Sequence, residues 1–182
     1  MEEALKIVNQ AMQEAESVRA PKGQPYQALQ NNVSAAASEL NSLANELPTT
    51  GRTNPDQLAP VATAFAKKFQ ELVHAGMSLA AASQDKEMEK AMLGHLRSLA
   101  TASSKILLAA KTLGADPSAP NAWNQLSGAA RGVTDSINDL LSVLSSAAPG
   151  QKECDDALRK ITVSRTYTHV PPAVCRGKEQ LL

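Results

Sequence analysis

The sequence predicts an all-α fold: five long antiparallel helices in a bundle, followed by one short extra helix and a tail. Three observations lead to this prediction. Apolar residues recur every three to four positions along most of the chain, which places them on one face of a helix. Proline and glycine divide that pattern into helix-length segments. No stretch alternates with period two for long enough to form a strand.

The first predicted helix spans Glu2 to Arg19, and the second spans Tyr26 to Leu47. Pro21 separates them, because proline removes a backbone N–H and clashes with the preceding turn. Pro48 and Gly51 are expected to end the second helix for the same kind of reason.

The third predicted helix runs from about Asp56 to Ala82, and Pro60 fits because it falls near the first turn. A short break then leads to the fourth helix, with Ser83 as its expected N-cap. That helix carries its last apolar residue at Leu113. Gly114 is the expected residue just beyond its C-terminus.

The fifth predicted helix, from about Ala119 to Ala147, has the most ordered apolar face in the chain. Its apolar residues are spaced 3, 1, 3, 4, 3, 1 and 3 apart, so they share one side of the helix. These residues are Leu126, Ala129, Ala130, Val133, Ile137, Leu140, Leu141 and Leu144. Such a face can form bundle core or a surface that docks in the groove of a partner, but not both at once.

The remaining residues are expected to lie outside the bundle. A short amphipathic helix is predicted over 151–161, and residues 163–182 carry no helical pattern, which is typical of a disordered or poorly packed tail. The expected boundaries are therefore 1–148 for the five-helix bundle, 149–162 for a single following helix and 163–182 for the tail.

Bulk composition excludes several classes of protein. Equal numbers of basic and acidic residues, 18 each, disfavour a nucleic-acid binder and a protein whose main partner is an anionic membrane. The longest apolar run, Ile106 to Ala110, is too short for a transmembrane segment. The first ten residues do not resemble a secretory leader, and Cys154 and Cys175 are expected to be free thiols in a reducing cytoplasm.

A search for reactive groups predicts no enzyme, no cofactor and no metal site. Glu71 and His74 form one Glu-x-x-His pair, but a di-metal bundle needs two, and neighbouring lysines favour a solvated charged face. His95 is interpreted as a boundary histidine. Cys154 has no histidine nearby in sequence, and His169 has no partner that the sequence indicates.

Several hydroxyl residues fall on or beside the apolar faces. A hydroxyl in a core contributes less than a methyl group, so these residues predict a bundle of modest stability, unless they lie at the edge of the buried face. They are Thr63, Thr101, Ser103, Ser104 and Thr134.

The ordered face of the fifth helix resembles the vinculin-binding helix of the talin rod, whose pattern is L-x-x-A-A-x-x-V-A-x-x-V-x-x-L-I-x-x-A. Thr134 stands where the third alanine of the pattern falls, and Leu144 stands at its last alanine. The matching positions are Leu126, Ala129, Ala130, Val133, Thr134, Ile137, Leu140, Leu141 and Leu144.

The resemblance to talin rods extends over residues 1 to about 161, as one complete five-helix bundle and the start of the next. Segments 102–126 and 148–158, and the run Thr53-Asn54-Pro55, are similar to talin rod sequences. Residues 163–182 resemble nothing in that family. They look like an alternative end, with Met1 an internal position of a longer parent.

The resemblance implies a cytoskeletal adaptor that works in the cytoplasm at focal adhesions. Proteins of the talin family join integrin tails to actin, and tension opens some rod bundles to expose buried helices that bind vinculin. Two other classes stay open on composition: a membrane-surface protein of amphipathic helices and a bundle metalloenzyme. Within the adaptor class, the segment could also be a spacer that binds no partner.

Overall fold

A computed structural model of the chain describes residues 1–19, 22–83 and 85–146. These residues form five α-helices and one 3-10 turn, without a strand, which confirms the predicted all-α bundle. The elements are α1 (Glu2–Ala15), α2 (Tyr26–Thr53), η1 (Pro55–Gln57), α3 (Leu58–Ser83), α4 (Lys86–Ala115) and α5 (Ala122–Ser146). The predicted helix over 151–161, the tail over 163–182 and the boundaries after 148 and 162 fall outside the described residues.

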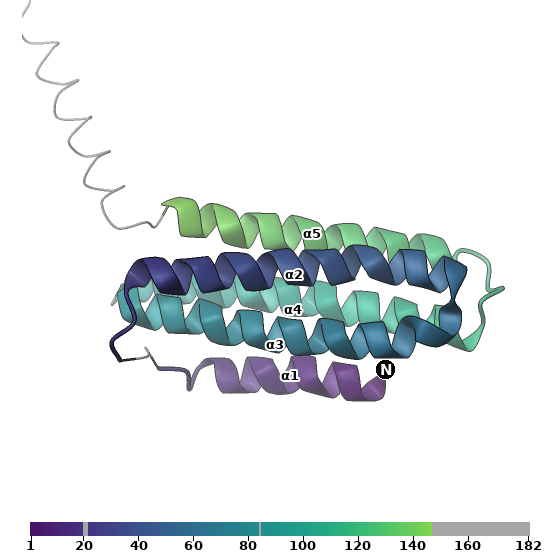
Figure 1. Cartoon of the computed structure of the whole chain (residues 1–182), viewed down its shortest axis with the longest axis horizontal. Coiled ribbons are helices and arrows are strands. Elements are labelled where there is room, and N and C mark those ends of the chain that lie inside the picture. The colour runs from purple at the N-terminus through teal and green to yellow at the C-terminus, as the bar shows by residue number, and fades with distance from the viewer. Residues whose placement is uncertain (20–21, 84, 147–182) are drawn as a thin grey trace, which may run out of the picture. The chain divides into compact units, whose positions relative to one another are not determined.

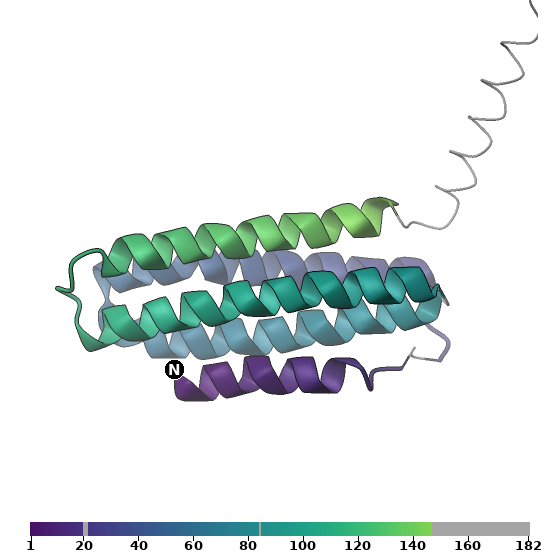
Figure 2. The ribbon, with the colours of Figure 1, turned by 180° about the vertical axis from the view of Figure 1, so that it is seen from behind.

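The five helices belong to one compact unit, residues 1–145. Helices α2, α3 and α4 contact one another, and α1 lies against α3 and α4 (Figure 1). Helix α5 lies on the other side of the bundle from α1, as the reverse view in Figure 2 also shows. Two ion pairs place α1 antiparallel to α4: Glu2 with Lys111 at 3.0 Å and Glu16 with Arg97 at 2.9 Å.

The core is built mainly from leucine and alanine. Both phenylalanines of the chain, Phe65 and Phe69 on α3, are completely buried. In helix α1, the larger apolar side chains Leu5 and Met12 are only half-buried and flank the contact with α3 and α4. Its fully buried residues are Ala4, Val8, Ala11 and Ala15. These mostly small side chains let α1 approach α3 and α4 closely, although they bury little apolar area.

The prediction that α2 ends at Leu47 is wrong. The helix continues through Pro48 to Thr53, although an internal proline removes one helical hydrogen bond. Pro48 and Gly51 are both buried, so packing in the bundle offsets that loss. The helix stops at Asn54, which precedes Pro55 and lies outside the helical region, with φ −152° and ψ 80°.

Both predicted ends of α4 are also wrong. Ser83 is the last residue of α3, and the N-cap of α4 is Asp85, whose carboxylate accepts from the N–H of Glu87 at 2.9 Å. Gly114 lies inside α4, since the helix continues to Ala115 and ends in an extended Asp116 ahead of a proline.

Helix α5 begins three residues later than predicted, at Ala122. The preceding Asn121 has a φ of +68°, in the left-handed region that asparagine tolerates better than most residues. Its carbonyl accepts the N–H of Gln125 at 2.9 Å, which closes the first turn of the helix.

Candidate functional site

The candidate site is the face of α5 that the sequence singled out, named here the α5 ridge. Six of its nine residues are at most 3% exposed, and they are spaced 4, 3, 4, 3 and 4 apart, as in the seam of a coiled coil. These six are Leu126, Ala130, Val133, Ile137, Leu140 and Leu144. The other three, Ala129, Thr134 and Leu141, are half-buried. The ridge is therefore part of the bundle core.

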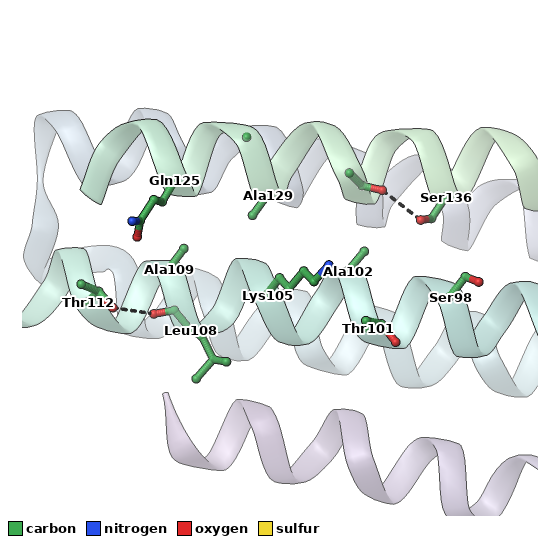
Figure 3. Close-up of a pocket in the computed structure, with 12 residues that line it drawn as sticks. Ser98, Thr101, Ala102, Lys105, Leu108, Ala109, Thr112, Gln125, Ala129 and Ser136 are labelled. Atoms are coloured by element: carbon green, nitrogen blue, oxygen red, sulfur yellow. Dashed lines mark hydrogen bonds between the residues drawn. The ribbon is translucent and has the colours of Figure 1, made fainter. Parts of the chain in front are cut away.

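One edge of the ridge faces α4 across a groove of about 700 Å³ (Figure 3). Ala102 and Ala109 of α4 point toward α5, and Ala129 of α5 points back toward α4. Gly128 and Gly132 also line the groove. Because these side chains are small, the two helices leave a furrow between them at this edge and not a filled seam.

The opposite edge of the ridge faces α2 and carries two hydrogen bonds between the helices. The Thr134 hydroxyl donates to Oδ1 of Asn41 at 2.7 Å, and the indole Nε1–H of Trp123 donates to the Pro48 carbonyl at 2.9 Å. The Arg52 guanidinium lies 4.9 Å from the centroid of the Trp123 ring, within the range of a cation–π contact. The pairing order, with Asn41 near Thr134 and Pro48 near Trp123, makes α2 and α5 antiparallel.

Gly51 on α2 lets several helices converge at the start of the ridge. A Cβ atom placed on Gly51 would lie 2.5 Å from Leu113 on α4, 3.3 Å from Leu126 on α5 and 3.6 Å from Leu58 on α3. The first distance is far below van der Waals contact, so any side chain here displaces buried leucines.

The substitution Gly51→Val is expected to lower the free energy of unfolding by about 1–3 kcal/mol through overpacking. Urea denaturation followed by circular dichroism would measure the loss. Gly94→Val is the matched control, because Gly94 is also helical, and a Cβ atom placed on it would meet no described atom within 4 Å. Equal stabilities of the two variants would contradict the close packing at Gly51.

The other residues considered for chemistry lie apart from the ridge. Glu71 and His74 are exposed on α3, and His95 is half-buried on α4. Lys68 forms ion pairs with Glu39 of α2 and with Glu71, both at 2.7 Å. The hydrogen bond to Glu39 has the largest effect on the Lys68 ammonium and the one to Glu71 comes next, and both raise the pKa of Lys68. Within the part of the chain that the structure describes, no three His, Cys, Asp or Glu side chains cluster as a metal would require. Cys154, His169 and Cys175 fall outside the described residues.

The hydroxyl residues near the apolar faces differ in how deeply they are buried. Ser103 is completely buried, and its hydroxyl has no partner among the described residues, which is unfavourable for stability. Thr101 is exposed, while Thr63, Ser104 and Thr134 are half-buried. The hydroxyls of Thr63 and Thr101 bond to the carbonyl four residues earlier in their own helices. Thr134 differs because its hydroxyl reaches a different helix.

The residues of α2 that meet the ridge could not be identified from the sequence. Asn41 and Pro48 are separated from their partners by 93 and 75 positions, and helical periodicity carries no information about contacts at that distance. For Trp123, the sequence indicates that a buried indole N–H needs an acceptor, but it does not indicate which carbonyl accepts it.

Comparison with known proteins places the chain in a family. Residues 1–149 match the sequence model of a talin 1-like rod segment domain. Talin of Oscarella pearsei is 49% identical over 139 residues, and talin-1 of Gallus gallus is 42% identical over 151 residues. Talin-2 of Mus musculus is 44% identical over 141 residues. These alignments cover 76%, 83% and 78% of this chain.

The same alignments cover only 6% of each relative, so the chain spans a small part of the length of the talins that it matches. None of the described helices combines the length and hydropathy of a membrane span. The match over residues 1–149, the identities above 40% and the helical bundle agree with one another, and the chain belongs to the talin family as a rod segment domain.

Proposed function

We propose that this chain is a rod segment of a cytoskeletal adaptor and that α5 is a ligand helix kept inside the bundle. In this proposal, tension on the rod separates α5 from its neighbours, and the α5 ridge then docks in a groove of the vinculin head. The adaptor links integrin adhesions to actin through other parts of a talin chain and acts in the cytoplasm at focal adhesions. The proposed role is that of a scaffold and not of an enzyme.

The burial of the α5 ridge is the observation that carries the proposal. Leu126, Val133 and Leu140 have no exposed surface, so a partner has no access to them while the bundle is closed. The same residues match the apolar positions of the vinculin-binding pattern. A helix that docks through these side chains must first leave α2 and α4.

The energy scale supports opening by force. A unit of this size is held together by about 5–15 kcal/mol, and its extension releases roughly 450 Å of chain. Dividing the energy by the distance gives a force on the order of 1–3 piconewtons, and chain-stretching entropy adds to it. A few cytoskeletal motors acting together supply forces of that size.

A membrane-surface role is less well supported than the adaptor role. A protein of that class presents an apolar helix face to the lipid. In the described part of the chain, the apolar faces point into the bundle, and Leu108 is the one large hydrophobic side chain that is mostly exposed, at 51%. Flotation of the protein with liposomes would support the membrane alternative.

The decisive experiment compares the isolated helix with the intact chain. A peptide spanning Ala122 to Ser146 is expected to bind the vinculin head at least about 1000-fold more tightly than the full chain, because the full chain must first open. Isothermal titration of both ligands against the vinculin head would measure the ratio. Equal affinities would contradict the proposal that burial of α5 prevents binding. A peptide that does not bind would favour the alternative in which the segment is a spacer that binds no partner.

A further inference from the structure

The contacts between α2 and α5 divide into two kinds that behave differently when α5 is released. The apolar residues of the α5 ridge are satisfied by any complementary apolar groove, because hydrophobic contact is not directional. The hydrogen bonds of Thr134 and Trp123 have their acceptors on α2. Only contacts that differ between two states shift the balance between them, so these bonds favour the closed state specifically.

The Thr134 hydroxyl has an alternative in the released helix, but that alternative adds little. A threonine in an isolated helix bonds back to the carbonyl four residues earlier, as Thr63 and Thr101 do here. In the bundle the hydroxyl instead donates to Asn41 at 2.7 Å, from a half-buried position where water competes less than at the surface. Release of α5 also leaves Oδ1 of Asn41 without this donor.

The second contact sits where α2 carries its internal proline. A carbonyl oxygen has two lone pairs, so Pro48 can accept the indole N–H of Trp123 without losing its place in the helix. Arg52, one turn further along α2, covers the indole ring and limits its orientation. Trp123 therefore ties the start of α5 to α2, while Thr134 ties its middle.

We propose that Thr134, Asn41, Trp123 and the Pro48 carbonyl form a polar clasp that sets how readily α5 separates from α2. The clasp regulates the exposure of the α5 ridge. Its hydrogen bonds form only in the closed bundle, whereas the apolar residues of the ridge can also pack in the groove of a partner. The effect of the clasp on the opening of α5 does not depend on what α5 binds. Its consequence for vinculin rests on the function proposed above.

Hydrogen exchange of the full chain tests the clasp without any ligand. Thr134→Val removes the hydroxyl and keeps the branched shape, and the α5 amides are expected to exchange about fivefold faster, the factor that corresponds to one ordinary hydrogen bond. Asn41→Ala should have a similar effect, and the double variant should be no faster than either single variant.

Two controls separate the clasp from general destabilisation. Thr63→Val removes a hydroxyl that bonds within its own helix, and Ser136→Ala does the same on α5, where the hydroxyl bonds to Gly132. Neither should accelerate α5 exchange by more than about twofold, since a bond within one helix does not hold two helices together. If Thr134→Val accelerates α3 amides as much as α5 amides, Thr134 supports the whole bundle and does not control α5, which would overturn the proposal. Additive effects of Thr134→Val and Asn41→Ala would overturn it as well.

Vinculin binding provides the second measurement. With Asn41→Ala, which removes the acceptor of Thr134 on α2 and changes no residue of α5, the full chain is expected to bind the vinculin head about fivefold more tightly, up to the limit set by the Ala122–Ser146 peptide. A peptide that fails to bind contradicts the proposed function, and the exchange experiment still decides the clasp. Unchanged binding by the full chain, with the wild-type peptide binding well, contradicts the clasp alone.

Discussion

Truncation of Phe69 to alanine is expected to weaken the bundle and strengthen its binding to vinculin. The loss of a fully buried phenylalanine lowers the free energy of unfolding by about 3–5 kcal/mol. Because docking of α5 must first overcome that free energy, the apparent affinity of the full chain for the vinculin head should rise by about 100-fold or more. It cannot exceed the affinity of the free α5 peptide, which sets the upper limit of the effect.

Phe69 is well suited to this test because it lies on α3 and is absent from the peptide. The chain has only two phenylalanines, and both have zero exposure, so each is a large share of the aromatic packing in a core of smaller side chains. Phe69→Ala leaves every residue of the α5 ridge unchanged. A gain in affinity must then come from easier opening and not from new contacts.

Thermal denaturation would measure the stability of the Phe69→Ala variant, and titration with the vinculin head would measure its affinity. Gln70→Ala is the control, because Gln70 is exposed on the same helix and its removal should change stability by less than about 0.5 kcal/mol. A destabilised Phe69→Ala variant with wild-type vinculin affinity would show that bundle opening does not limit binding.

Replacement of Val133 by aspartate is expected to destabilise the closed bundle and to weaken the binding of the released α5 helix to the vinculin head. Val133 has no exposed surface, and an unpaired carboxylate in its place costs several kcal/mol, enough to lower the melting temperature by more than about 10 °C. In the α5 peptide, the same change puts a charge in the middle of the apolar ridge. Its affinity for the vinculin head should fall by about 100-fold or more.

The sign of the change in binding therefore separates Val133 from Phe69. Both substitutions destabilise the closed bundle, but only the one on the ridge weakens the bound state. Asn138→Asp is the matched control for charge, since Asn138 is exposed on α5 and the variant should keep both stability and peptide affinity. A Val133→Asp peptide that binds as tightly as the wild-type peptide would mean that the ridge is not the docking surface.

Helix ends were predicted less well than helix faces, and the reason is tertiary packing. Pro48 was expected to stop α2, and in an isolated helix the lost hydrogen bond would favour that outcome. In the bundle, Leu47, Pro48 and Gly51 are all buried, and the packing of this turn is worth more than the missing bond. The α4 ends were decided locally instead, by the stronger cap at Asp85 and by the proline that follows Asp116.

The order of apolar residues along α5 determined by itself that this helix has one core-facing side, because a period of 3.6 residues leaves no other way to bury Leu126, Val133 and Leu140 together. Only the tertiary structure decided which helices cover that side. It set Thr134 opposite Asn41 and Trp123 opposite Pro48, across 93 and 75 positions of sequence. Periodicity describes the geometry of one helix, whereas the choice of neighbours follows from how five helices of different length and side-chain size fill a common core.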